Sequence, residues 1–129
     1  MSYQHCVVWL DHQHATVIDF TFEDEHVRQV EREGGHRKVH HKAGGTGAKE
    51  KDDHHFFDEV VATVGDAREI LIVGPGNAKV AFQHDLQHRH RQVADRVVGV
   101  ETVDHPTDGQ LLAHARTYFK KVDALRGDA

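Results

Sequence analysis

The sequence has one cysteine, two prolines and no long apolar run. Cys6 cannot form an internal disulfide, and its place in the apolar run 6–10 predicts a small buried side chain and not a nucleophile. The two longest apolar runs, 6–10 and 70–73, are far shorter than the roughly 20 residues of a membrane-spanning helix. The first residues lack the pattern of a signal peptide. We therefore expect a cytoplasmic protein with no membrane contact.

Histidine is the residue present in excess, with 14 among 129 residues spread along the chain. The formal net charge is −5 with neutral histidines, and protonation of all 14 would bring it to +9. Since histidine titrates near pH 6.5, mild acidification should reverse the sign of the charge. Length and a 38% hydrophobic content predict a single domain over residues 1–129 with one modest core.

Apolar periodicity predicts eight elements. Residues 4–10 are apolar on both alternating faces, which is typical of a central strand, whereas residues 25–32 carry many charges and suit an edge strand. Asp52 or Asp53 can cap a helix that stops near Gly65. The expected order is strands at 4–10, 14–22 and 25–32, a helix at 53–65, a strand at 69–73, a helix at 78–94 capped by Asn77, a strand at 97–103 and a helix at 108–125 opened by a Thr107/Gln110 capping box.

This order predicts an α/β fold. Three hairpin-joined strands followed by strand-helix-strand crossovers give a mixed five-stranded sheet, βββαβαβα, with helices on both faces. It is the order of the ribonuclease H-like architecture. The fold alone assigns no function.

A glycine-rich segment at about 34–51 interrupts the pattern, and we expect it to be a mobile loop. Residues 28–51 contain seven cations and three acids, a net +4 in a chain of −5. Such local positive charge is suited to the phosphates of nucleic acid, although a solvated loop would have the same composition. The candidate binding residues are Arg37, Lys38, His40, His41, Lys42, Lys49 and Lys51.

Two further features have a functional and a structural interpretation. His84 and His88 are spaced i, i+4 on an expected helix, so they could bind zinc or nickel, or simply face solvent. Gly74-Pro75-Gly76 favours a strand-to-helix turn over a phosphate-binding loop, because the spacing of that motif is absent and Pro75 removes a donor. We expect no cofactor.

Three stretches resemble a known family. Residues 70–82, ILIVGPGNAKVAF, are similar to the strand, Gly-Pro-Gly turn and Lys-x-x-Phe helix start in the central domain of Pelota and of archaeo-eukaryotic class 1 release factors. Residues 7–18 resemble the first hairpin of that domain, and residues 108–112 the start of its last helix. The resemblance spans nearly the whole chain and implies a stand-alone, bacterial-type relative of this domain of the translational machinery.

The resemblance also bears on function. In release factors the loop before the first long helix carries Gly-Gly-Gln, which positions the water that hydrolyses peptidyl-tRNA; here Gly44, Gly45 and Thr46 stand at that place. Thr46 lacks the glutamine amide, whereas Pelota lacks the motif and still works on ribosomes. The resemblance therefore implies a non-catalytic partner of the ribosome, rRNA or tRNA in stress, rescue or hibernation.

Two alternatives remain open at this point. One is a release-factor-like hydrolysis of peptidyl-tRNA through Gly44, Gly45 and Thr46. The other is a metal- or pH-responsive interaction module built on the histidines. In addition, the polar strand at 25–32 and the apolar stripe of the last helix leave room for a homodimer.

Overall fold

The computed structural model describes residues 4–32 and 46–125, without the side chains of residues 46–52. Most expected elements are present, with bounds that differ by a few residues. In chain order they are β1 (His5–Leu10), β2 (His14–Phe20), β3 (Glu25–Glu31), α1 (Thr46–Val64), β4 (Glu69–Gly74), α2 (Ala78–Arg89), α3 (Arg91–Ala94), β5 (Val97–Thr102) and α4 (Asp108–Leu125).

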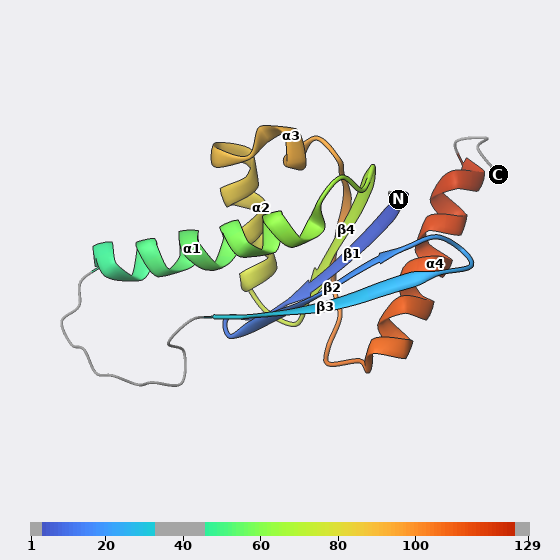
Figure 1. The fold of residues 1–129 in the computed structure, drawn as a ribbon, viewed down its shortest axis with the longest axis horizontal. Coiled ribbons are helices and arrows are strands. Elements are labelled where there is room, and N and C mark those ends of the chain that lie inside the picture. The colour runs from blue at the N-terminus through green and yellow to red at the C-terminus, as the bar shows by residue number, and fades with distance from the viewer. Residues whose placement is uncertain (1–3, 33–45, 126–129) are drawn as a thin grey trace.

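The strands form one five-stranded sheet in the order β3-β2-β1-β4-β5 (Figure 1). The pairs β1·β2 and β2·β3 are antiparallel, whereas β1·β4 and β4·β5 are parallel. The predicted mixed sheet is therefore confirmed, as are the central position of β1 and the edge position of β3.

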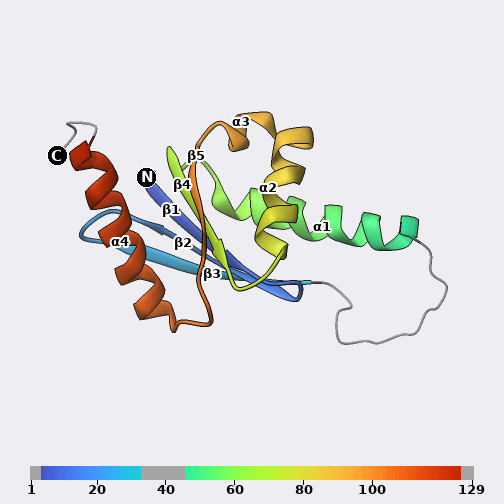
Figure 2. The ribbon, with the colours of Figure 1, turned by 180° about the vertical axis from the view of Figure 1, so that it is seen from behind.

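Helices cover both faces of the sheet. The three inner strands, β2, β1 and β4, are therefore buried on both sides. Helices α1, α2 and α3 lie over one face and α4 over the other (Figure 1, and from behind in Figure 2). Successive β1 residues enter opposite cores: Cys6, Val8 and Leu10 pack on the α1/α2 side, and Val7 and Trp9 on the α4 side. This alternation explains why β1 is apolar throughout, and Cys6 is the buried small side chain that the sequence predicts.

The helix ends follow local chemistry in most places. Gly65 ends α1 with φ 68°, a left-handed conformation that glycine adopts without strain. The Thr107/Gln110 capping box is confirmed: the Thr107 N–H donates to Gln110 Oε1 over 2.9 Å, and the Gln110 N–H to Thr107 Oγ1 over 3.1 Å. Asn77 precedes α2, but its side chain makes no capping hydrogen bond, so that part of the prediction is wrong.

The start of α1 differs from the prediction. The helix begins at Thr46, not after Asp52 or Asp53, so Lys49 and Lys51 lie in α1 and not in the expected loop. Residues 46–52 have no apolar periodicity, and hydrophobic patterning therefore cannot detect their helical conformation.

The helix expected at 78–94 is divided in two. His90 has φ −138° and ψ 62°, which is not helical, although its N–H still donates to the Leu86 carbonyl. Its own carbonyl accepts from Val93 and Ala94 and starts α3. The apolar spacing continues into Val93, which is buried, and so it conceals the break.

The parallel pair β1·β4 gives the sheet two distinct ends. The carboxyl end is where β1 and β4 finish, at Leu10 and Gly74, and the amino end is where they start, at His5 and Glu69. Among the described residues, no helix has the length and apolar character needed to cross a membrane.

Candidate functional site

The predicted binding segment joins the body at the carboxyl end of the sheet. In the β2·β3 register Glu31, the last residue of β3, lies beside His14, which follows the end of β1. Helix α1 starts at the same end, and its first turns project beyond the sheet (Figures 1 and 2). The chain therefore leaves β3 and enters α1 at the same end of the sheet.

Arg32 anchors the chain just before this segment. Its Nε donates to the His12 carbonyl over 2.6 Å, and its Nη1 lies 2.9 Å from Asp53 Oδ1 of α1. The guanidinium also lies over the Phe56 ring, 4.8 Å from the centroid. One side chain therefore joins the β1-β2 turn, the end of β3 and α1.

Two of the seven cations counted in residues 28–51 are thus already engaged by carboxylates. Arg32 is paired with Asp53, and Arg28 Nη2 lies 2.6 Å from Asp19 Oδ2. Arg37, Lys38, His40, His41, Lys42, Gly44 and Gly45 lie outside the described residues. Thr46, Lys49 and Lys51 lie in the first turns of α1, where the backbone alone is described.

His84 and His88 are both exposed on α2, and their ring centroids are 4.3 Å apart. Across residues 4–32 and 46–125, no further histidine, cysteine or carboxylate completes a three-ligand group with them. The metal interpretation of this pair stays a prediction.

Close to this pair, Arg89 joins two carboxylates. Its Nη1 donates to both oxygens of Asp85 at 3.0 Å, and its Nη2 donates to Asp58 Oδ1 over 2.8 Å. His90 Nε2 lies 2.9 Å from the same Asp58 oxygen. Desolvation raises the pKa of Asp58, but the hydrogen bonds from His90 and Arg89 outweigh it and hold that pKa below its ordinary value. These carboxylates already have a cation between them.

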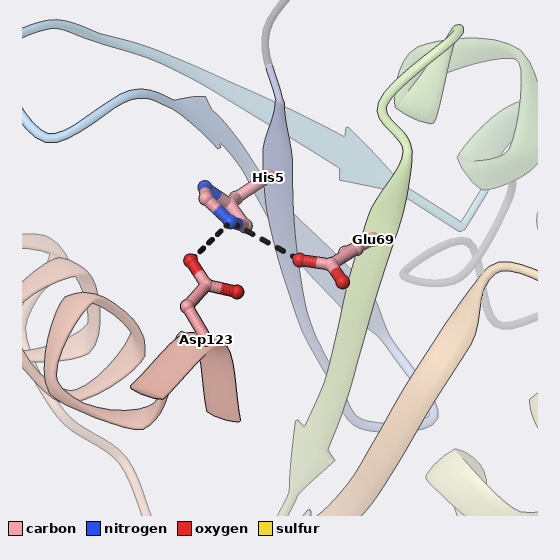
Figure 3. A group of neighbouring side chains, drawn as sticks. All are labelled: His5, Glu69 and Asp123. Carbon is pink, nitrogen blue, oxygen red and sulfur yellow. Dashed lines mark ion pairs between the residues drawn. The ribbon is translucent and has the colours of Figure 1, made fainter. Parts of the chain in front are cut away.

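A second cluster of titratable side chains lies at the opposite, amino end of the sheet. His5 Nε2 lies 3.2 Å from Glu69 Oε1 and 3.6 Å from Asp123 Oδ2 (Figure 3). The three residues come from the first positions of β1 and β4 and from the last turns of α4. They line a surface cavity of about 570 Å³ together with Gln4, Thr21, Phe22 and Arg68.

His5 is 2% exposed, and its imidazole packs against aromatic rings. Its centroid lies 4.4 Å from that of Phe119, 5.4 Å from Phe22 and 5.6 Å from Phe20. Burial lowers the pKa of His5, while the carboxylates of Asp123 and Glu69 oppose this shift. The ring is therefore neutral at neutral pH and keeps a nitrogen lone pair.

This cluster is not among the candidate sites predicted from the sequence. His5, Glu69 and Asp123 are far apart in the chain and form no motif. A signal was present in the topology, because the starts of parallel neighbours β1 and β4 must lie side by side. Asp123 joins the cluster only because α4 packs over that end of the sheet, which the strand order alone does not predict.

The comparisons with known proteins concern the fold. No family model matches the chain, and no curated protein matches it. Among solved structures, Archaeoglobus fulgidus Pelota matches 88% of this chain with a TM-score of 0.61 and 16% identity. Thermoplasma acidophilum Pelota matches 81% with a TM-score of 0.58 and 19% identity, and an archaeal translation termination factor, aRF1, matches 95% with a TM-score of 0.55 and 14% identity.

This chain spans 30%, 29% and 41% of the length of those three proteins. At such identities the matches establish a shared fold and nothing about residues or activity. The predicted resemblance to Pelota and to release factors is confirmed at that level: the chain has a fold found in part of these proteins.

Proposed function

We propose that this protein serves the translation apparatus as a non-catalytic, ribosome-associated protein that contacts the phosphates of rRNA or tRNA through residues 37–51. The observation that carries the proposal is the fold match over most of the chain to Pelota and to a translation termination factor. Within the proposal, the chain is related to the central domain of those proteins and has a ribonuclease H-like architecture.

The distribution of charge supports binding through this segment. Residues 33–51 contain five cations and two acids, whereas the whole chain has a net charge of −5. Positive charge is therefore concentrated in the part of the sequence that joins β3 to the first turns of α1, whereas the rest of the chain is acidic. RNA phosphates attract such a segment and repel the rest, which would orient the protein on a ribosome.

The non-catalytic part of the proposal rests on Thr46. Its hydroxyl group cannot reproduce the two N–H donors and the carbonyl of the glutamine amide that follows Gly-Gly in release factors. The protein would accordingly occupy a site on the ribosome without releasing peptide.

The experiment is sedimentation of the protein with ribosomes through a sucrose cushion at low and physiological salt. The variant Lys38→Glu/Lys42→Glu replaces two cations of the segment by acids, and we expect it to lower ribosome affinity about tenfold or more. The matched control is Lys120→Glu/Lys121→Glu, which makes the same change of charge at two exposed positions of α4. This control should sediment as the wild type does.

Equal sedimentation of the wild type and the Lys38/Lys42 variant would contradict binding through the segment. A wild type that stays in the supernatant at both salt concentrations would contradict ribosome association itself. Release of peptide from peptidyl-tRNA by the wild type would replace the non-catalytic proposal by hydrolysis.

A further inference from the structure

The cluster of His5, Glu69 and Asp123 has the composition of a metal site. It offers one imidazole nitrogen and two carboxylate oxygens, and these three ligand atoms lie within 4.8 Å of one another. Imidazole with carboxylates suits divalent transition metals such as zinc, whereas Mg²⁺ and Ca²⁺ prefer oxygen ligands alone.

The distances fit a common centre. With metal–ligand bonds of about 2.0–2.1 Å, two ligand atoms of a tetrahedral site lie about 3.3 Å apart. The observed separations from His5 Nε2 are 3.2 Å to Glu69 Oε1 and 3.6 Å to Asp123 Oδ2. Figure 3 shows the nitrogen facing both carboxylates, whose ligand oxygens lie within 4.8 Å of each other, so one ion bound between them would draw the two carboxylates together.

An independent observation concerns the hydrogen bonds of His5. Within the described part of the chain neither of its ring nitrogens makes a hydrogen bond, although both are buried. A buried polar atom without a partner is costly, and most such atoms in proteins are paired. The Nε2 atom is aimed at the two carboxylates from which it obtains no hydrogen bond of good geometry, and an ion would provide its missing partner.

The other three-residue group of the described chain contains no buried histidine nitrogen without a hydrogen bond. Asp58, Asp85 and His90 also bring ligand atoms together, but Arg89 donates to both carboxylates. A guanidinium therefore occupies the place that a metal ion would need. His90 Nε2 also has a hydrogen-bond partner in Asp58 Oδ1, whereas the buried ring nitrogens of His5 have none among the described residues.

We propose that His5, Glu69 and Asp123 bind one divalent transition-metal ion, with Zn²⁺ as the representative, at the amino end of the sheet. The fourth position faces the cavity of about 570 Å³ and would hold water. The ion would join β1, β4 and α4. This site lies at the opposite end of the sheet from the start of α1, and it does not depend on the proposed role in translation.

The test uses Zn²⁺ held at low free concentration by a chelating buffer, with the thermal unfolding midpoint and the bound zinc per chain as readouts. Exposed histidines remain available to zinc after unfolding, so binding there changes the midpoint little, whereas an ion that needs the folded site raises it. We expect one equivalent of zinc, a higher midpoint and no comparable effect of Mg²⁺.

The variants are Asp123→Asn and Glu69→Gln, with Asp58→Asn as the control that removes a carboxylate from the other group. Loss of a ligand should weaken zinc binding by at least about tenfold in the first two variants, since even outer partners of ligands cost 10–100-fold. Asp58→Asn should bind as the wild type does. Asp123 is partly exposed near the end of α4, so its variant tests the site with the fold intact.

Two results would overturn the proposal. One is a wild type whose midpoint does not respond to Zn²⁺, or responds equally to Mg²⁺. The other is an Asp123→Asn variant that folds as the wild type does without metal and binds zinc with unchanged affinity.

Discussion

At the residue scale, the buried carboxyl group of Asp19 in β2 has a hydrogen-bond partner among the described residues for only one of its two oxygens. Asp19 is 3% exposed and pairs through Oδ2 with Arg28, but its Oδ1 makes no hydrogen bond to any described residue. Burial raises the pKa of Asp19, and its contacts with Cys6 and Arg28 offset only part of this shift. The folded protein therefore holds a proton on Asp19 more tightly than the unfolded chain does.

The pH dependence follows from that difference. The stabilising contribution of Asp19 is complete below its unfolded-state pKa and is lost as the pH rises through its folded-state pKa. Asparagine at this position cannot ionise, so the unfolding midpoint of Asp19→Asn minus that of the wild type should increase between about pH 4 and pH 7. Thermal unfolding of both proteins across this range measures it.

The control for this prediction is Glu23→Gln, which removes an exposed carboxylate from the neighbouring turn. Comparison of the two variants separates the effect of the buried carboxyl group from the effect of removing any one carboxylate. A constant difference for Asp19→Asn would mean that burial does not raise the pKa of this group.

The structural role of a single residue can be predicted from the sequence only where its sequence neighbours determine that role. The burial of Cys6 and the Thr107/Gln110 capping box follow from neighbouring residues, and both are confirmed. The contact of His5 with Asp123 depends instead on the packing of α4 against the start of β1, which no spacing in the sequence encodes.

At the element scale, the turn between β4 and α2 is determined by close packing of two strands. A Cβ on Gly74 would collide with the carbonyl oxygen of Leu10, which belongs to the backbone of β1 and cannot move aside by a rotamer change. A Cβ on Gly76, two residues later, would meet nothing within 4 Å. The two glycines of one Gly-Pro-Gly turn thus have different roles.

This difference predicts the effects of two alanine substitutions. Gly74→Ala should lower the free energy of unfolding by about 1–3 kcal/mol, since overpacking has costs of that size. Gly76→Ala should change it by no more than about 0.5 kcal/mol. Urea unfolding of the two variants and the wild type measures both values, and equal effects would show that the contact with Leu10 does not constrain the turn.

The sequence predicts elements where their apolar residues face a core. β1 and β4 are read correctly because both of their faces are buried, and α4 because its stripe of Leu111, Ala115 and Phe119 contacts the sheet. The first turns of α1 project beyond the sheet, and their sequence, TGAKEKD, contains no apolar stripe from which a helix could be predicted. The break between α2 and α3 at His90 cannot be predicted from the sequence, because the buried Val93 continues the helical spacing of apolar residues.

At the scale of the whole molecule, the two ends of the sheet differ in charge and in chemistry. The carboxyl end bears the segment in which residues 33–51 have five cations and two acids. The amino end holds the carboxylates of Glu69 and Asp123 beside His5. The two proposals therefore assign RNA binding and metal binding to different ends of the sheet.

The proposed mode of binding limits the salt dependence of ribosome affinity. Each phosphate neutralised by a cation contributes a slope of about −0.7 to −0.9 to log K against log salt, so five cations allow a slope of about −3.5 to −4.5. At pH 8, where histidines of ordinary pKa are neutral, titration of labelled protein with ribosomes should give a slope within this limit. The Lys38→Glu/Lys42→Glu variant should make it shallower by about 1.5, since two contacts are lost. The Lys120→Glu/Lys121→Glu control should leave it unchanged. A much steeper slope would require cations elsewhere in the molecule, and a slope near zero would mean that phosphates are not what the protein recognises.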